Sequence, residues 1–234
     1  QPGGVLTRAG HTEAGCDLAR LAGLEPAAVI VEILNQDGSM ARRPDLERFG
    51  RERGIRIGTI ADLIRYRLEK ERNVERISEV MVDTEYGEFK MLCYDDRVNR
   101  VVHVALVKGD LSTTDNPLVR VHIQDTLGDV IGVKSSSLGW PLDSAIERIS
   151  KEDVGVIVLL RGQENAREFI EAVESLGDSH DEVRERRSGD AVLRTYGIGA
   201  QILRDLGLSK IRVLSAPKHM YAISGFDLEI TEYV

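Results

Sequence analysis

The sequence predicts two fold classes in one chain, an α/β arrangement in its first part and a mixed α+β arrangement in its second. Three observations lead to this prediction. Helix-like and strand-like patterns alternate in the first part, strand-like patterns follow one another after it, and the charged stretch 69–73 between them has no apolar face. We therefore predict domains at residues 1–70 and 79–234, joined by a linker at 71–78.

The first domain is predicted to alternate helices with strands. A helix is expected to end where a glycine can adopt the left-handed conformation, and a strand is expected at a short apolar run. In chain order the predicted elements are a helix at Thr12–Leu21 before Gly23, a buried strand at Ala28–Leu34, a helix at Pro44–Arg53 before Gly54, a strand at Ile55–Thr59, and a helix carrying Ile60, Leu63, Ile64 and Leu68.

The second domain is predicted to begin with an antiparallel meander. Residues 89–93 alternate, residues 95–99 form a turn, and Val101–Val107 returns. A half-buried strand follows at residues 119–123, with valines and an isoleucine on one side. Its other side carries a polar row of Arg120, His122 and Gln124, which is either part of a site or the solvated face of the sheet.

The remaining elements follow from apolar spacing. They are a helix with Leu142, Ile146 and Ile149, a buried strand at Val154–Leu160, and a helix with Phe169, Ile170, Val173 and Leu176 that ends at Gly177. The stretch Asp178–Asp190 is dominated by charge and lacks a hydrophobic period, so we expect a solvated connection there.

Composition excludes several classes of function. The chain has 234 residues, of which 42% are hydrophobic, enough for a core in each domain. No apolar run approaches the roughly 18 residues of a membrane span, and the net charge of -8 argues against general binding to nucleic acid. Cys16 and Cys93 are too few and too far apart for a disulfide framework or a cysteine-built zinc site. We expect a protein of the reducing cytoplasm, away from membranes.

The segment from Arg8 to Ala14 carries the first candidate site. Arg8 and Thr12 flank a predicted helix start, where free backbone amides attract anions such as phosphate. His11 is placed where an imidazole nitrogen can bind a metal, and Glu32 lies in an apolar run where burial would turn it into an acid or base. The alternative is that Thr12 caps the helix, His11 is a hydrogen-bonded surface residue and Glu32 faces solvent.

This pairing resembles the carboxy-terminal part of 3,4-dihydroxy-2-butanone 4-phosphate synthase, an enzyme of riboflavin biosynthesis. The resemblance runs from about Gly3 to Leu68 and includes the segments 38–42 and 59–64. It implies conversion of ribulose 5-phosphate to dihydroxybutanone phosphate and formate, assisted by Mg or Mn. By likeness, His11 is a metal ligand and, with Glu32, catalytic, while Arg8, Gly10 and Thr12 bind the substrate. The family's acidic loop, with the partner metal ligand, lies upstream, so we expect the chain not to complete that site alone.

Residues 79–234 resemble GTP cyclohydrolase II. The resemblance is carried by the segments 86–89, 103–110, 119–122, 128–130 and 196–207. That family holds a catalytic zinc with three cysteines, and the matching positions here carry Asp125, Ser136 and Leu138. Because a leucine cannot ligate zinc and one carboxylate leaves too few donors, we expect no zinc and a lost cyclohydrolase activity. His122 and Asp125 either recruit a harder ion or form a surface pair.

Further departures affect the phosphate region of the second domain. Residues 161–168 bring acidic groups to the place where the family binds triphosphate. In addition, Val192 stands at a position where the family resemblance leads us to expect an acidic residue. Several residues still allow an anion or nucleotide to bind: Arg120, Lys134, Arg194, Tyr196 and Lys218. The segment 196–201 also has a structural explanation, namely glycine turns that open a helix which Gly207 closes.

Two interpretations of function follow. In the first, the parent polypeptide is a riboflavin-pathway lyase with an inactive cyclohydrolase-like domain. In the second, residues 79–234 form a non-catalytic module for regulation or assembly that binds a nucleotide or flavin. GTP hydrolysis with a different metal is the weakest option, because the zinc-activated water would lack a source. Both families are typically dimeric, so we expect a homodimer.

Overall fold

In this computed structural model the chain divides into two compact units, residues 1–67 and 68–234, which are described separately. The structure describes the residues 1–134, 140–162, 166–176, 189–215 and 228–234. The predicted mixture of α and β structure is confirmed by a seven-stranded mixed sheet accompanied by helices. Among the described residues, none of the helices has both the length and the apolar character that a membrane crossing requires.

The elements have the following bounds. The helices are η1 (Gly4–Leu6), α1 (His11–Leu21), α2 (Arg43–Arg53), α3 (Ile60–Lys70), η2 (Leu111–Thr113), η3 (Thr126–Val130), α4 (Leu142–Ser150), α5 (Ala166–Ser175) and α6 (Gly189–Asp205). The strands are β1 (Val74–Thr84), β2 (Gly87–Asp96), β3 (Val101–Lys108), β4 (Leu118–Ile123), β5 (Gly155–Leu160), β6 (Lys210–Val213) and β7 (Glu229–Tyr233).

The three predicted helices of the first unit are confirmed, and local signals set their ends. α2 stops at Gly54, which has a φ of 65° and adopts the left-handed conformation that side chains disfavour. At the start of α3, the Thr59 hydroxyl accepts a hydrogen bond from the Asp62 amide at 3.1 Å. Short-range chemistry therefore accounts for the helices of this unit.

Both strands predicted in the first unit are wrong. Residues 28–33 and 55–59 belong to no strand, and Leu34 makes only an isolated bridge with Met40. The segment 28–34 is largely exposed, with Val29 at 96%. A strand needs a neighbour that accepts and donates its backbone hydrogen bonds. Residues 1–67 contain no strand with which these apolar runs could pair, so the runs stay outside any sheet and are largely exposed to solvent.

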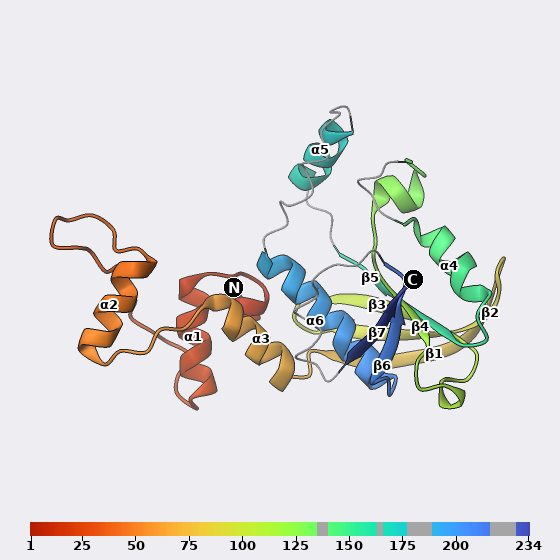
Figure 1. Cartoon of the computed structure of the whole chain (residues 1–234), viewed down its shortest axis with the longest axis horizontal. Helices are drawn as coiled ribbons and strands as arrows, with labels where there is room; N and C mark the ends of the chain where they lie inside the picture. The colour runs from red at the N-terminus through yellow and green to blue at the C-terminus, as the bar shows by residue number, and fades with distance from the viewer. Residues whose placement is uncertain (135–139, 163–165, 177–188, 216–227) are drawn as a thin grey trace. The chain divides into compact units, whose positions relative to one another are not determined.

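The second unit is built on one sheet with the strand order β1-β2-β3-β5-β4-β6-β7 (Figure 1). The antiparallel pair predicted at residues 89–107 is confirmed as β2 and β3, and β1, which was not predicted, pairs antiparallel with β2. β3 pairs antiparallel with β5, and the remaining pairs are parallel. Residues 74–78, predicted as part of the linker, already belong to β1. The candidate zinc region follows β4, at the carboxyl ends of its parallel strands.

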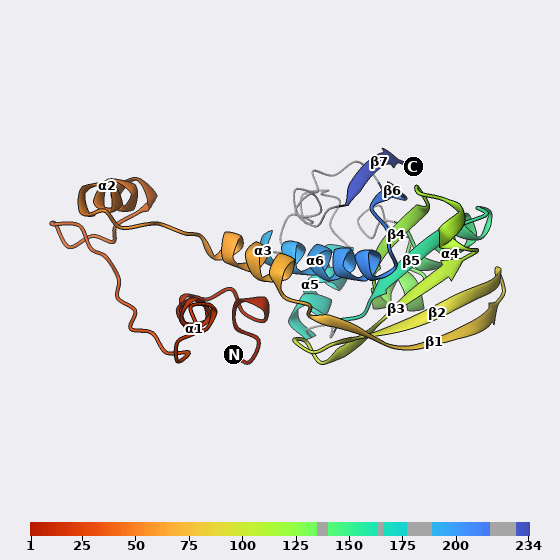
Figure 2. The ribbon, with the colours of Figure 1, turned by 90° about the horizontal axis from the view of Figure 1, so that it is seen from below.

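Helices α4 and α6 cover opposite faces of this sheet. On one face Leu118 and Ile157 share a core with Ile149 of α4. On the other face Val121 of β4 approaches Gly199 of α6, which runs along the strands (Figure 2). Alternation along β4 therefore turns Arg120 and His122 toward the α4 face. His122 is only 5% exposed and Arg120 is partly buried, whereas Gln124, just beyond the strand, is exposed. Only the first two residues of the predicted polar row are therefore turned away from solvent.

Two glycines in the interior of α6 lie close to side chains of other elements. The segment 196–201 lies within α6, so its glycines are not opening turns, although Gly207 with a φ of 83° follows the helix as predicted. A Cβ at Gly197 would lie 2.6 Å from Leu68 Cδ1, and one at Gly199 would lie 3.1 Å from Val121 Cγ1. A side chain at Gly197 would force the buried Leu68 to move, whereas at Gly199 the neighbouring valine would have to give by only a few tenths of an ångström.

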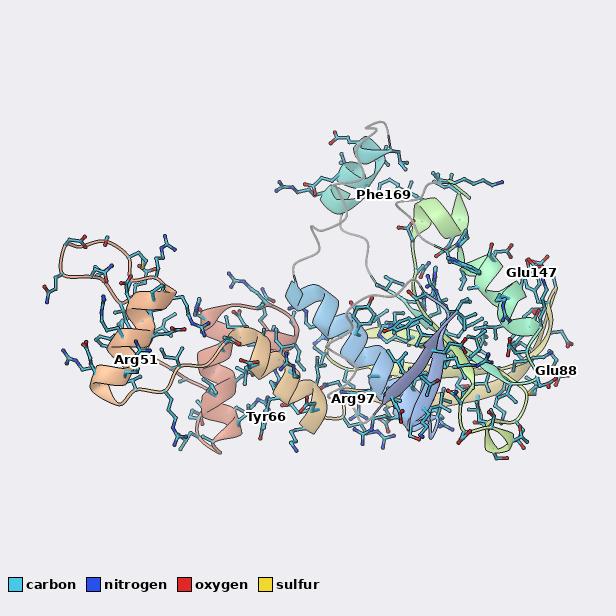
Figure 3. All side chains as sticks on the ribbon, viewed as in Figure 1. Arg51, Tyr66, Glu88, Arg97, Glu147 and Phe169 are labelled. Atoms are coloured by element: carbon cyan, nitrogen blue, oxygen red, sulfur yellow. The ribbon has the colours of Figure 1, made fainter. Side chains whose placement is uncertain are left out.

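Helix α5 is confirmed as a helix, but its apolar stripe is not buried. Phe169 lies on this helix (Figure 3), where Ile170 is 56% and Val173 44% exposed. Gly177 and most of the predicted charged connection lie outside the described residues, and residues 189–190 of that stretch already belong to α6. A helical period predicted the element correctly without determining what it packs against.

Asp205, at the end of α6, ties this helix to the meander. Its carboxylate accepts hydrogen bonds from Arg76 of β1 at 2.7 and 2.9 Å and from the Tyr94 hydroxyl of β2 at 3.0 Å, and it pairs with Arg72. Burial alone would raise the pKa of Asp205. The hydrogen bonds from Arg76 and Tyr94 and the guanidinium charges outweigh burial, so this pKa lies below its ordinary value.

We expect Asp205→Asn to lower the free energy of unfolding by about 2 kcal/mol, because Arg76 and Tyr94 lose a charged acceptor. Since the folded pKa is depressed, this contribution is fully present above the unfolded pKa of about 4 and is lost as the pH falls through the folded value. Thermal unfolding should show a Tm difference from wild type that shrinks below about pH 4. Asp83→Asn, at an exposed position of β1, is the control. A difference that persists at the lowest pH would contradict this account.

Candidate functional site

The predicted phosphate-binding segment of the first unit lies at the start of α1. Gly10 is the residue that precedes the helix, in an extended conformation, and it provides no side-chain cap. Thr12 therefore does not cap α1, contrary to the structural alternative. Arg8, His11 and Thr12 are all exposed. Apart from the amide that the Glu13 side chain engages, the first turn thus presents the amides of His11 and Thr12 together with an arginine, an imidazole and a hydroxyl, which suits a phosphate.

Glu13 holds Arg8 near this helix end. Its carboxyl group is 4% exposed, and its Oε1 lies 3.5 Å from Arg8 Nη1. A hydrogen bond from its own backbone amide, assisted by the charge of Arg8, holds the pKa of Glu13 below its ordinary value. A Cβ at Gly10 would lie 2.3 Å from Glu13 Oε2, so a glycine is needed there for the carboxylate to fit. Sequence reasoning missed Glu13.

Glu32 is placed apart from these groups. It lies in the exposed extended segment, which passes α1 where Ala28 faces Gly15. Within residues 1–67, all of which the structure describes, no hydrogen bond or ion pair joins Glu32 to His11. The buried environment expected for Glu32 depended on the strand that does not form, so the structure brings together Arg8, Gly10, His11 and Thr12 but leaves Glu32 in solvent.

A buried aspartate anchors the segment before α1. Asp17 Oδ2 accepts hydrogen bonds from the Val5 amide and from Arg67 Nη1, both at 2.8 Å. Neither Asp17 nor Arg67 was a candidate from sequence. The available signal was that Glu13 and Asp17 are four residues apart and therefore share one face of α1.

In the second unit, Asp129 organises the loop that follows β4. His122 Nε2 lies 2.8 Å from Asp129 Oδ2, which also accepts a hydrogen bond from the Asp125 amide at 2.9 Å. Asp129 Oδ1 accepts from the Leu142 amide at 3.1 Å. The partner of His122 is thus Asp129 and not Asp125, and the pair is buried rather than on the surface. Asp129 was noted in sequence only as part of the segment 128–130.

The positions that match the zinc cysteines serve other purposes or lie outside the described residues. Asp125 Oδ1 accepts a hydrogen bond from the Gly128 amide at 2.8 Å and so begins η3. Ser136 and Leu138 lie in a stretch that the structure does not describe. Within the described ranges, no group of three His, Cys, Asp or Glu side chains is arranged to hold a metal ion.

Arg120, the central candidate for nucleotide binding, is engaged by the backbone. Its Nη1 donates to the Leu214 carbonyl at 3.0 Å and its Nη2 to the Trp140 carbonyl at 3.5 Å. Burial lowers the pKa of Arg120, and Tyr196 and Asp129 partly offset this effect. Arg194 belongs to the same helix as Tyr196, Lys134 is exposed, and Lys218 lies outside the described residues.

His103 is a second buried histidine, and its contacts are structural. Its Nδ1 accepts a hydrogen bond from the Arg161 amide at 3.1 Å, so the proton resides on Nε2, which faces Asp96 Oδ2 at 3.3 Å. Burial by itself would raise the pKa of Asp96, but hydrogen bonds from His103, Asn99 and two backbone amides lower it overall. Since both ring nitrogens are occupied, His103 has no free atom for a metal or substrate.

Two family profiles match the chain. The profile of 3,4-dihydroxy-2-butanone 4-phosphate synthase matches residues 1–66, and that of GTP cyclohydrolase II matches residues 75–234. A 3,4-dihydroxy-2-butanone 4-phosphate synthase of Photobacterium phosphoreum is 51% identical over 235 residues, which cover 100% of this chain and 63% of the relative. The riboflavin biosynthesis protein RibBA of Bacillus cereus is 42% identical over 238 residues, with coverage of 99% and 60%.

A solved structure is also similar. RibBX, a two-domain 3,4-dihydroxy-2-butanone 4-phosphate synthase from A. baumannii, matches with a TM-score of 0.78 and 42% identity, covering 100% of this chain and 62% of that one. The chain thus spans about 60–63% of the length of the relatives that it matches.

We expect Asp129→Asn to lower the free energy of unfolding by about 1–3 kcal/mol. All three groups around this carboxylate are donors, so either orientation of an asparagine amide sets an NH2 group against one of them. Chemical denaturation would measure the change, with Asp153→Asn at an exposed position as the matched control. Equal stability of the two variants would show that the Asp129 contacts are dispensable.

Proposed function

The chain belongs to the GTP cyclohydrolase II family, whose profile covers well over half of it, and from this premise we propose that it forms part of a lyase of riboflavin biosynthesis. In this proposal the synthase-like segment, residues 1–66, contributes to the conversion of ribulose 5-phosphate to dihydroxybutanone phosphate and formate. The cyclohydrolase II domain is catalytically inactive. The parent polypeptide acts as a homodimer with Mg or Mn as its metal.

One observation carries the proposal for the first unit. Arg8, His11 and Thr12 are exposed together around a helix start that no preceding side chain caps. Arg8 and the free amides bind the phosphate of a sugar phosphate, because both place positive charge on one spot. The Thr12 hydroxyl adds a hydrogen-bond donor, and Gly10 lets the backbone approach.

The metal fits this site only in part. Mg and Mn prefer oxygen ligands and accept imidazole, so His11 supplies one donor and further oxygen ligands are required. When bound, such an ion would polarise the oxygens of a sugar phosphate. Glu32 moves protons in this proposal, which requires its extended segment to be covered, since a solvated carboxylate is a weak base.

Three residues support the loss of GTP cyclohydrolase activity. Asp125 begins η3 with its carboxylate, His122 is bound to Asp129, and the Arg120 head group binds two carbonyl oxygens. Positions that would serve zinc and triphosphate thus hold the fold together. With no cysteine at positions 125, 136 and 138, a zinc-activated water lacks its source.

A second candidate function for this domain is regulation or assembly through a bound nucleotide or flavin. The observation in its favour is that Arg120, a partly buried cation, is retained on the face of the sheet that α4 covers. The two functions are compatible within one polypeptide.

Formate release tests the principal proposal, because ribulose 5-phosphate and GTP would each yield it. We expect the whole natural polypeptide to release formate from ribulose 5-phosphate only. Arg8→Ala should lower kcat/KM by about 10- to 100-fold, as expected for a charge-assisted hydrogen bond of roughly 1.5–3 kcal/mol. Glu47→Gln, which removes an exposed ion pair with Arg43, is the control. Formate from GTP would refute the inactive assignment, and an unaffected Arg8→Ala would refute the phosphate site.

Thermal unfolding with added nucleotides tests the second candidate. A ligand at about 100 times its Kd stabilises the folded state by roughly 2.7 kcal/mol. If the domain binds a nucleotide, GTP or flavin mononucleotide at millimolar concentration should raise the Tm, and Tyr196→Phe should retain the rise while Tyr196→Ala reduces it. An unchanged Tm with both ligands would eliminate this function.

A further inference from the structure

Helix α1 buries its carboxylates and exposes its leucines. Glu13 is 4% and Asp17 5% exposed, whereas Leu18 is 59% exposed. A surface helix normally does the opposite. Because a buried carboxylate is costly unless donors surround it, the carboxylate of Asp17 requires specific partners.

Asp17 has such partners on two other segments. Its Oδ2 receives the Val5 amide and Arg67 Nη1, each at 2.8 Å, and the same Nη1 donates to the Gly3 carbonyl at 2.7 Å. Both side chains of the ion pair are 5–7% exposed. The pair therefore holds one carbonyl and one amide of the segment 3–5 and links them to α1 and α3.

The contacts of Asp17 are linked to Arg8 through the backbone of Gly4. Gly4 has a φ of 63°, and a Cβ there would lie 2.3 Å from Asp17 Oδ1, so only glycine allows the backbone to come this close. The Gly4 carbonyl in turn accepts hydrogen bonds from the amides of Thr7 and Arg8, both at 3.0 Å. A continuous chain of contacts thus runs from Asp17 to the residue proposed to bind phosphate.

We propose that Asp17 and Arg67 are positioning residues that hold the segment from Gly3 to Arg8 so that Arg8 and the α1 amides converge on the phosphate of the substrate. The proposal rests on the proposed lyase function. Neither residue contacts the sugar phosphate, and both act through the backbone. An ion pair suits this role because its directional hydrogen bonds select one loop conformation, which a packed apolar pair would not do.

Two readouts test the proposal in the whole natural polypeptide at a temperature where every variant is folded. The first is hydrogen exchange at the amides of residues 4–13, and the second is the KM for ribulose 5-phosphate. We expect Asp17→Asn to accelerate exchange at Val5 and Arg8 by about tenfold or more and to raise KM by about tenfold with a smaller change in kcat. Glu47→Gln should change neither. Arg67→Lys, which retains the charge, should stay closer to wild type in exchange rate and in KM than Arg67→Met.

A second variant addresses the loop without removing the ion pair. Gly4→Ala should reproduce the effects of Asp17→Asn, because its Cβ would displace the loop from the Asp17 carboxylate. Its control is Gly54→Ala, which has nearly the same φ of 65° but meets no atom within 4 Å. This comparison separates backbone strain from displacement of the loop and remains available if Asp17→Asn does not fold.

The outcomes distinguish this proposal from the lyase function. A lower Tm for Asp17→Asn with unchanged exchange and KM would overturn the positioning role and leave a structural one. If wild type releases no formate from ribulose 5-phosphate, the lyase function fails, and with it the link to substrate. Hydrogen exchange would still test whether Asp17 and Arg67 hold the segment from Gly3 to Arg8. Faster exchange at residues 4–8 in Asp17→Asn supports this role, and unchanged exchange refutes it.

Discussion

Aspartates that are wholly or partly buried and need hydrogen-bond donors around them are the constraint on which both units depend. Asp17 joins the segment before α1 to two helices, and Asp205 joins the end of α6 to β1 and β2. Asp129 does the same between β4, η3 and the start of α4. In each case an unmatched carboxylate would destabilise the fold, so the donors around it must remain in place. Elements far apart in sequence are thereby held at defined positions.

The same constraint holds together the cyclohydrolase II framework of the second unit. His122, Asp125 and Arg120 each make contacts that the fold uses, as a partner of Asp129, as the start of η3 and as a donor to two carbonyls. Such contacts do not need zinc. These three residues therefore have a role in the stability of the sheet that is independent of catalysis.

The first unit shows the complementary situation, in which order is concentrated near the proposed phosphate site. The segment before α1 is tied down by Asp17, Arg67 and Glu13, whereas the apolar segment 28–34 that carries Glu32 lies in solvent. The binding groups are thus prearranged, while the proposed proton-transfer group is not. Prearranged donors favour binding of a charged ligand because little ordering remains to be done.

The sequence by itself determined the features that depend on neighbouring residues. These are the helices that end at Gly54 and Gly207, the alternation in β2 and β3, and the absence of cysteine at positions 125, 136 and 138. Turn and helix signals act within a few residues, so one segment suffices to predict them.

Only the tertiary structure decided which polar side chains are buried and which residues they pair with. Asp17 and Arg67 are 50 residues apart, and Asp205 and Arg76 are 129 apart, so no local pattern could pair them. The same reason accounts for the strand at 28–34 that was predicted but does not form, since an apolar run becomes a strand only beside another strand. It also accounts for His122, whose place in a polar row did not reveal that Asp129 would bury it. Partners supplied from distant parts of the chain decide whether a polar side chain forms a site, a clamp or a solvated surface.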